Sequence, residues 1–157
     1  MRLVLQRVKR AAVVIDGHER REIDAGLMIL LGITHDDTPE IARFMAKKAA
    51  ELRIFSDENG AMNRSLLDVG GQALVVSNFT LYANCRKGRR PSFVEAGGPK
   101  IAEPLYRQFL RDLQDGGVLR VASGEFGADM QVELTNDGPV TLLLDSQDIM
   151  PQRGGSF

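Results

Sequence analysis

The residues of this chain that could do chemistry lie in two short polar stretches, each beside an apolar run. In the first stretch, Ser77, Asn78 and Thr80 lie at the end of a run that starts at Ala73. Hydroxyls at the end of a buried strand satisfy backbone groups there, or they present themselves and nearby N–H groups to a ligand. Serine and threonine act as nucleophiles beside a base, and no obvious base partner is visible here. A Ser-His-Asp triad is therefore not expected.

The second stretch, Asn136 to Thr141, separates two apolar runs that begin at Met130 and Val140. Its Asp-Gly and Gly-Pro dipeptides are typical of turns, which predicts a hairpin. A second interpretation is a cis Gly138-Pro139 bond, which costs only about 0.5–1 kcal/mol for X-Pro. The carbonyls of both residues would then point outward as rigid acceptors able to test the shape of a small ligand. Spacing alone favours the plain turn.

A basic segment lies between residues 86 and 90 and carries four cations, namely Arg86, Lys87, Arg89 and Arg90. Charge runs are usually solvated faces, and the alternative is a phosphate-binding loop. Tyr82 and Phe93 flank the segment, which hints at base stacking. The neighbouring Cys85 is either a bystander or a thiol activated by these cations.

Metal and cofactor chemistry has little support in the sequence. The chain has one cysteine and two histidines, His18 and His35, in polar surroundings where we expect them to be solvated. Asp36 and Asp37 precede an expected helix, where acids serve the helix N-terminus more often than a cation. The sequence shows no P-loop, dinucleotide-binding or Gly-x-Ser-x-Gly pattern. We therefore predict no metal and no cofactor.

Composition indicates one ordinary globular domain. The chain has 157 residues, 43% apolar and 26% charged, with a formal net charge of -1, so any nucleic-acid binding must come from a local patch. A single cysteine fits a reducing compartment. The N-terminus has no signal-peptide core, and no run approaches the ~20 apolar residues of a membrane span. We expect a soluble cytoplasmic protein.

Hydrophobic periodicity predicts strands and two long helices. Thr38 and Pro39 mark a helix start, as N-cap and first residue. The helix should end near Arg53 and bury the face of Ile41, Phe44, Met45, Lys48, Ala49 and Leu52. A second helix is expected over 99–115, either starting just before Pro104 or kinked there. Strands are expected at 2–8, 11–16, 19–24 (an edge strand), 27–33 (buried on both faces), 53–56, 73–81, 118–123, 129–135 and 139–145.

This element order predicts an α+β fold with a mainly antiparallel sheet and two covering helices. Residues 1–145 should form a single domain. Residues 146–157 lack periodicity, and we expect them to be a flexible, frayed tail.

Both polar stretches resemble the signature motifs of the D-aminoacyl-tRNA deacylase family. The matching segments are Ser77-Asn78-Phe79-Thr80-Leu81 and Asn136-Asp137-Gly138-Pro139-Val140-Thr141, with flanking matches at 5–8, 53–57, 62–63, 90–93 and 126–132. The resemblance runs in order from residue 1 to about 145. One position departs, because Asn78 stands where the family usually has Gln, so a side-chain contact there is lost or bridged by water.

The resemblance implies a barrel-like deacylase fold and a homodimer, in which the cis Gly138-Pro139 turn of one subunit enters the active site of the other. It implies hydrolysis of the ester between a D-amino acid, or glycine, and the 3′ adenosine of tRNA, with L-amino acids rejected by the carbonyl wall. Implied catalytic residues are Phe79 and Thr80, through oxyanion-binding N–H groups, with the terminal 2′-OH of the tRNA assisting. Implied substrate-binding residues are Ser77, Asn78, Met130, Asn136, Gly138, Pro139 and Thr141, and implied phosphate-binding residues are Arg86, Lys87, Arg89 and Arg90.

Two other functions stay open at this point. One is a non-catalytic RNA- or partner-binding module that kept the fold. The other is a small-molecule hydrolase that uses Thr80 as a covalent nucleophile.

Overall fold

Strand β1, Arg2–Ile15, connects most of the sheet, because it pairs with three other strands. The structure is a computed structural model that describes residues 1–151. The first half of β1 pairs with β3 (Gly26–Gly32) and the second half with β2 (Glu19–Ile23). Strand β8 (Met130–Asp145) pairs with both halves, and all three pairings are antiparallel.

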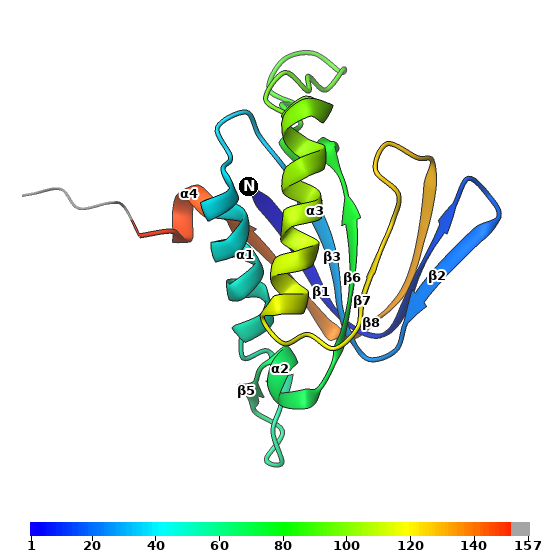
Figure 1. Ribbon diagram of the computed structural model, residues 1–157, viewed down its shortest axis with the longest axis vertical. Helices are drawn as coiled ribbons and strands as arrows, with labels where there is room; N and C mark the ends of the chain where they lie inside the picture. Colours follow the sequence, from blue (N-terminus) through cyan, green and yellow to red (C-terminus); the bar gives the residue numbers. More distant parts are fainter. Residues whose placement is uncertain (152–157) are drawn as a thin grey trace, which may run out of the picture.

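The sheet continues beyond β3 through two parallel pairings. Strand β6 (Gln72–Ser77) lies beside β3, and β7 (Val121–Ser123) lies beside β6. The order is β2-β1-β3-β6-β7, with β8 attached to β1, which gives a nearly closed, barrel-like sheet (Figure 1). The predicted α+β class is confirmed, and "mainly antiparallel" describes three of its five pairings.

Two long helices, α1 (Pro39–Glu51) and α3 (Pro99–Asp115), cover one face of this sheet (Figure 1). The hydroxyl of Thr38 accepts the N–H of Ile41 at 3.3 Å, so the predicted start of α1 is confirmed. Helix α3 begins at Pro99 and runs through Pro104, so it does not begin just before that proline. No helix within residues 1–151 has the length and apolar character to cross a membrane.

The buried face of α1 is rotated from the one predicted. Its buried residues are mostly alanines, namely Ala42, Met45, Ala46, Ala49 and Ala50. Ile41, Phe44 and Leu52 are only partly buried and pack at the margin of the core. Small side chains let α1 lie close to its neighbours, which large apolar residues at the same positions would prevent.

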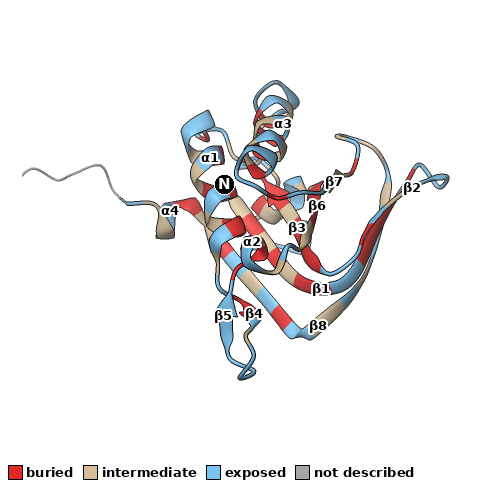
Figure 2. Cartoon of the chain, turned by 60° about the horizontal axis from the view of Figure 1, so that its bottom comes forward, coloured by how far each residue is buried: buried red, intermediate tan, exposed pale blue. Residues whose placement is uncertain are grey.

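Two hydrophobic clusters lie on opposite faces of the sheet, as the period of two along a strand requires. In β3, Leu27, Ile29 and Leu31 pack under the helices, while Met28 packs on the other face. The predicted burial of this strand on both faces is confirmed. Figure 2 shows the buried residues gathered in this central region, while much of β8 is exposed.

Five short elements complete the fold. Strands β4 (Phe55–Ser56) and β5 (Met62–Arg64) form a small hairpin. Helix α2 (Leu66–Val69) begins with a reciprocal capping box, and the 3₁₀ helix η1 (Phe79–Tyr82) follows β6. Helix α4 (Ser146–Ile149) follows β8.

The predicted hairpin at Asn136–Pro139 is wrong, because β8 continues through it. Both halves of β8 pair with β1, so the chain never reverses direction. Gln6 pairs with Thr141 and Val8 with Asn136, so residues 137–140 lie opposite Arg7 alone. The turn residues therefore form a wide bulge in one strand. The break predicted in β1 between residues 8 and 11 is likewise a register shift in a single strand.

The expected frayed tail also needs correction at its start. Ser146 is buried, donates its N–H to the carbonyl of Met1 at 2.9 Å and opens helix α4. Its hydroxyl accepts from the α-amino group of Met1 at 2.8 Å, and that group also contacts Asp37 at 2.6 Å. The remainder of the tail, residues 152–157, lies outside the described residues.

Candidate active site

A cleft of about 510 Å³ opens where β6 ends. Its walls come from the β6–η1 junction, from the loop before α3 and from the segment between β7 and β8. Four predicted site residues line it together, namely Ser77, Asn78, Phe79 and Met130. The other lining residues are Leu31, Ile33, Phe93, Ala96, Gly97, Pro99, Ala102, Phe126, Gly127 and Ala128.

Asn78 shapes the floor of this cleft by capping η1. Its Oδ1 accepts the N–H of Thr80 at 3.3 Å and also the Thr80 hydroxyl. The backbone therefore turns after Ser77, and the strand predicted to reach Leu81 ends there. An amide oxygen does not take up a proton at neutral pH, so this contact orients the hydroxyl of Thr80 without activating it.

The far end of η1 is held by Arg2. Its Nη1 donates to the carbonyl of Leu81 at 3.0 Å, and its guanidinium lies 4.5 Å from the ring centroid of Tyr82. Asp145 accepts from Nε of Arg2 at 2.7 Å. Burial raises the pKa of the Tyr82 phenol, so this side chain stays neutral. These contacts tie the site-bearing turn to the beginning of β1.

Two aromatic rings lie at the mouth of the cleft. Phe79 is 57% exposed, and its ring makes an edge-on contact with Phe93 at 5.1 Å between centroids. Exposed aromatic rings are suited to stacking nucleic-acid bases. Tyr82, the other aromatic residue beside the basic segment, is buried and faces the core instead.

Hydrogen bonds from the side chain of Asn136, within the bulge, stabilise the bulge in β8. Asn136 accepts the N–H of Val140 at 2.8 Å and donates to the hydroxyl of Thr141 at 3.0 Å. The Gly138-Pro139 peptide bond is cis, and Gly138 has φ +134. A Cβ at Gly138 would lie 2.8 Å from a methyl group of Val140, so only glycine fits this position.

Arg7 anchors the bulge from the opposite strand. Its Nε donates to the carbonyl of Asp137 at 3.0 Å, and its Nη1 donates to the carbonyl of Ile54 at 2.7 Å. The carboxylate of Asp137 lies 3.5 Å from the same guanidinium. Arg7 is 9% exposed, so the anchor is shielded from water.

In a single chain the bulge and the cleft are separate. None of the residues from 136 to 141 is among those that line the cleft within residues 1–151. Gly138 and Pro139 are both exposed at the surface of the chain. The structure therefore brings Asn136, Gly138, Pro139 and Thr141 together with one another, but not with Ser77, Asn78, Phe79 and Met130.

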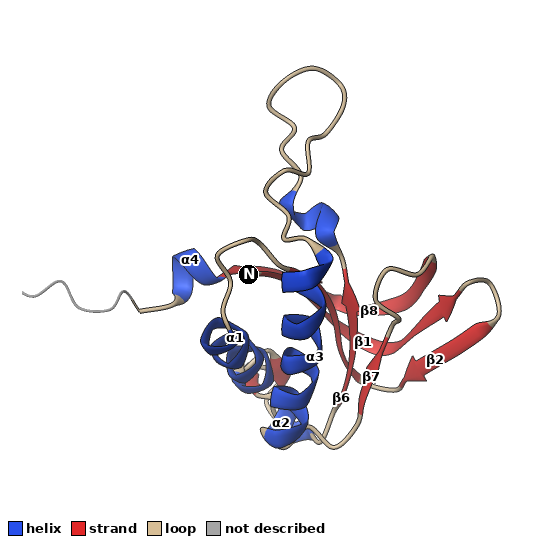
Figure 3. Ribbon diagram, turned by 45° about the horizontal axis from the view of Figure 1, so that its top comes forward, coloured by secondary structure: helices blue, strands red, loops and turns tan. Residues whose placement is uncertain are grey.

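The four cations of the basic segment lie on a loop that projects from the body of the molecule (Figure 3). All four are exposed, as is Cys85. Asn84 and Ser92 pair at the neck of the loop, with backbone hydrogen bonds of 2.8 and 2.9 Å. The loop continues into Phe93 and Ala96, which line the cleft, so the charges lie on an extension of one cleft wall.

Neither histidine lines the cleft. His18 contacts the carbonyl of Asp16 at 2.8 Å, and His35 contacts the carbonyl of Val94 at 2.7 Å. Asp37, considered above as a cation ligand, accepts the N–H of Thr34 at 2.8 Å and the amino group of Met1. The part of the chain that the structure describes holds no group of three acidic, His or Cys residues placed to bind a metal.

Several lining residues were not singled out from the sequence. Phe126, Gly127 and Ala128 were part of a matching segment without an assigned role, and Gly97, Pro99 and Ala102 had no signal at all. Arg7 also lay in a matching segment. Its position opposite the bulge depends on the register of two strands more than 120 residues apart, which no local pattern shows.

The fold and the cleft define an α+β protein with an open binding site at a strand end. Residues 4–145 match the family model described as D-Tyr-tRNA(Tyr) deacylase. The chain is 57% identical over 148 residues to the D-aminoacyl-tRNA deacylase of Thermus aquaticus, covering 94% of this chain and 97% of that protein. It is 56% identical over 147 residues to the protein of that name from Halalkalibacterium halodurans, covering 94% and 100%. The chain belongs to this deacylase family and is a hydrolase.

Two solved structures share the fold of this chain. The structure of a protein named "c-Myc DNA Unwinding Element Binding Protein" superposes with a TM-score of 0.87 at 40% identity, covering 93% of this chain and 99% of that one. A probable eukaryotic D-amino acid tRNA deacylase superposes with a TM-score of 0.81 at 18% identity, covering 91% and 97%. The second comparison bears on the fold alone.

Proposed function

We propose that this enzyme hydrolyses the ester between a D-amino acid, or glycine, and the 3′ adenosine of tRNA, while sparing L-aminoacyl-tRNA. The observation that carries the proposal is the cleft at the end of β6, which gathers Ser77, Asn78, Phe79 and Met130. The names of relatives that share more than half of their residues with this chain give the substrate class. Charged tRNA is used in translation, so the enzyme acts in the cytoplasm.

The reaction needs little from the protein, because an aminoacyl ester is already activated. Water attacks the carbonyl carbon, and N–H groups of Phe79 and Thr80 stabilise the oxyanion, each worth about 2.7–4 kcal/mol. In the free chain the N–H of Thr80 donates to Oδ1 of Asn78 over a long 3.3 Å, so an oxyanion could replace this acceptor or share the N–H with it. The assisting group is the 2′-OH of the tRNA, as the family resemblance implies, and a cleft that no histidine lines agrees with this role.

Chirality is tested by backbone carbonyls in this proposal. The bulge of a second subunit enters the cleft and presents the carbonyls of Gly138 and Pro139 to the α-carbon of the substrate. These acceptors hold the ammonium group, and an L side chain collides with the backbone behind them. The exposure of both residues, and their separation from the cleft of their own chain, support a homodimer as the active unit.

The basic loop completes the proposed interface. Arg86, Lys87, Arg89 and Arg90 contact phosphates of the acceptor stem and do not select a sequence. Phe79 and Phe93 stack on a terminal base at the cleft mouth. Both contacts place the 3′ end of the tRNA over the oxyanion donors.

The test is release of free D-tyrosine from D-tyrosyl-tRNA by the purified protein, with L-tyrosyl-tRNA as the control. Turnover of the D ester with little turnover of the L ester is expected, and equal turnover would contradict the carbonyl wall.

A second candidate is a non-catalytic nucleic-acid-binding module, which the name of the 40% identical DNA-unwinding-element-binding protein favours. A protein that binds tRNA or DNA but releases no amino acid would support that module instead.

A mixing experiment tests whether two subunits share one site. Ala128→Trp fills the cleft, and Gly138→Ala displaces the bulge, so each homodimer should be inactive. After co-expression, half of the dimers are mixed, and each mixed dimer keeps one intact site if cleft and bulge come from different subunits. Activity should then recover to about a quarter of the wild-type level. No recovery would mean that each site is built within one chain.

A further inference from the structure

One wall of the cleft is an irregular segment between two strands. Phe126, Gly127 and Ala128 of this segment line the cleft after the end of β7 at Ser123, together with Met130 at the start of β8. Residues outside regular strands need other contacts to keep one conformation.

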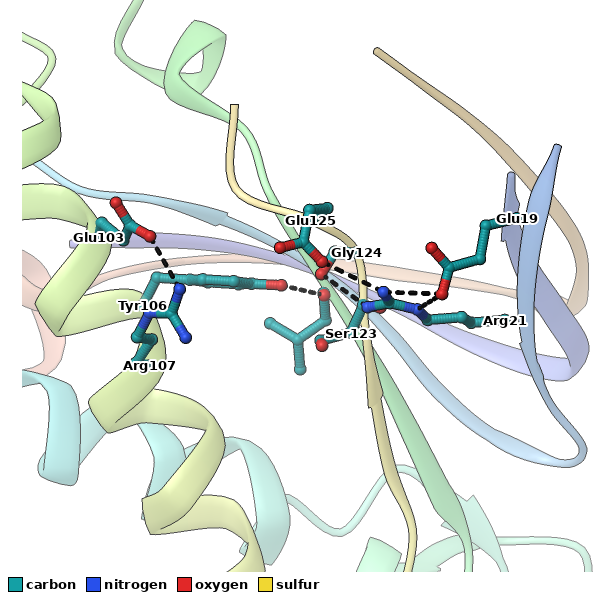
Figure 4. A network of polar contacts seen from close by, with 9 residues as sticks. Glu19, Arg21, Glu103, Tyr106, Arg107, Ser123, Gly124 and Glu125 are labelled. Atoms are coloured by element: carbon teal, nitrogen blue, oxygen red, sulfur yellow. Dashed lines mark hydrogen bonds and ion pairs between the residues drawn. The ribbon is translucent and has the colours of Figure 1, made fainter. Parts of the chain in front are cut away.

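Arg21 of strand β2 forms hydrogen bonds to the beginning of this segment (Figure 4). Its Nη1 donates to the carbonyl of Ser123 at 2.9 Å and to the carbonyl of Gly124 at 3.3 Å. Its Nη2 contacts the carboxylate of Glu125 at 3.1 Å. One guanidinium therefore binds three consecutive residues, the last of them directly before Phe126.

A second carboxylate orients this guanidinium. Glu19, also on β2, accepts from Nε and Nη2 of Arg21 at 3.1 and 3.0 Å. This hydrogen bond, together with that of Glu125, raises the pKa of Arg21 despite partial burial. A planar fork held by a carboxylate on one edge presents its other N–H groups in a defined direction.

Tyr106 of α3 supports the same segment from the opposite side (Figure 4). Its hydroxyl donates to the carbonyl of Val75 at 2.8 Å, which also accepts the N–H of Gly124 at 3.1 Å. Its ring lies 6.1 Å from the ring of Phe126. Burial raises the pKa of Tyr106 to about 12, so this donor keeps its proton at physiological pH.

The two ends of the segment also contact each other. Gly124 is buried, and a Cβ there would lie 2.5 Å from the sulfur of Met130, so its two ends touch. The N–H of Asp16 donates to the carbonyl of Asp129 at 2.8 Å, which secures the second end. Movement at the Arg21 end would therefore shift the residues that line the cleft.

We propose that Arg21 is a positioning residue, which clamps Ser123–Glu125 so that the wall from Phe126 to Met130 receives the aminoacyl end of the substrate. This inference rests on the proposed function. Arg21 does not line the cleft among the described residues and acts only through the segment that it holds.

The neighbouring Arg20 supplies a matched control. It lies on the same strand and is also paired, with Glu22 at 3.2 Å and Glu133 at 2.7 Å, but neither partner belongs to the cleft wall. Successive residues of a strand point to opposite faces. Arg20→Gln therefore removes the same charge and the same number of paired carboxylates without touching Ser123–Glu125.

The experiment compares Arg21→Gln with Arg20→Gln by kinetics and by hydrogen exchange of the amides in 124–130. Arg21→Gln should raise KM for D-tyrosyl-tRNA about tenfold, change kcat by less than about twofold and speed exchange in the wall. Arg20→Gln should leave KM and exchange unchanged. A general loss of folded protein would instead lower the apparent kcat of Arg21→Gln at constant KM, and the result for Glu125→Gln then decides.

Two further arms separate the clamp from direct tRNA binding and from misfolding. If Arg21 bound tRNA phosphate directly, its effect would vanish with 3′-D-tyrosyl-adenosine, whereas a clamp on the wall acts on both substrates. Glu125→Gln removes one partner while keeping Arg21, and should also raise KM even if Arg21→Gln folds poorly.

An inactive wild-type enzyme would refute the proposed function. An active wild type with unchanged KM in both Arg21→Gln and Glu125→Gln would refute the clamp alone.

Discussion

Replacing Arg7 by Met should both destabilise the protein and loosen its chiral selection. The guanidinium donates to the carbonyls of Ile54 and Asp137 at 2.7 and 3.0 Å, and its side chain is 11% exposed. Hydrogen bonds to charged groups contribute about 1.5–3 kcal/mol each. Methionine fills the space of the aliphatic stem but leaves both carbonyls without this donor.

The expected loss of unfolding free energy is about 3 kcal/mol when the lower end of that range is taken for each of the two bonds, because the apolar packing is kept. For a chain of this length, 1 kcal/mol corresponds to about 2–4 °C, so the melting temperature should fall by about 6–12 °C. Thermal unfolding followed by circular dichroism measures this directly. Lys9→Met, at an exposed site on the same strand, should change the unfolding free energy by only about 0.5 kcal/mol.

Selectivity reports on the bulge separately from stability. With its anchor removed, the Asp137-Gly138 backbone is free to shift away from the substrate, and the ratio of D to L turnover should fall about tenfold, equivalent to about 1.4 kcal/mol. The assay compares kcat/KM for D- and L-tyrosyl-tRNA at a temperature where Arg7→Met is folded. A folded Arg7→Met with wild-type selectivity would refute this role of Arg7. A melting temperature equal to that of Lys9→Met would refute the energetic estimate.

Three other perturbations have defined outcomes. Thr80→Val should lower kcat by less than about tenfold and give no acyl-enzyme by mass spectrometry, because the Thr80 hydroxyl has no base; a loss of about a thousandfold would indicate covalent catalysis. Arg89→Gln with Arg90→Gln should raise KM for charged tRNA and reduce the slope of log KM against log salt by about one for each lost phosphate contact; an unchanged slope would remove the loop from the interface. Burial raises the pKa of Asp145, but the hydrogen bonds from Arg2 and from the N–H of Gln147, with the positive charges of Arg2 and the N-terminus, together outweigh it, so the net pKa is lowered. The unfolded state therefore binds more protons than the folded state as pH falls, and the stabilisation by the Asp145 carboxylate is lost. The loss of unfolding free energy caused by Asp145→Asn should be largest above about pH 4 and shrink as pH falls further, as measured by urea unfolding. A loss that is independent of pH would contradict this.

The sequence correctly predicted the elements whose structure depends on neighbouring residues in the chain. The continuous apolar run at 27–33 gave a strand buried on both faces, and Thr38-Pro39 gave the start of α1. The expected end of the second helix at residue 115 is also confirmed, and Gly116 follows it as the C-cap. Helix α2 was missed although Ser65 and Asp68 have the spacing of a capping box, because a helix of four residues has no periodicity to detect.

Predictions failed where a long-range partner decides the local structure. Asn136–Pro139 has the composition of a turn, and an isolated peptide would be expected to reverse there. In the protein, β1 pairs with both halves of β8, and Arg7 and Asn136 supply hydrogen bonds to the backbone that the sheet leaves unpaired. A bulge and a hairpin thus share the same residues, and only the neighbouring strand distinguishes them.

The arrangement of the candidate site also depends on long-range contacts that the sequence does not show. Ser77, Asn78 and Phe79 of the first motif line the cleft, but Gly138 and Pro139 of the second motif are exposed on another part of their own chain. Each motif is held in place within one chain, the first by the Asn78 cap and the second by the Arg7 anchor. Folding of one chain therefore preorganises both halves of the proposed site without joining them. It follows that variants of Arg7 and Arg21 should affect different steps, selection by the bulge and binding by the cleft wall. In a dimer with shared sites, an Arg7 defect acts on the cleft of the partner, while an Arg21 defect acts on the cleft of its own chain.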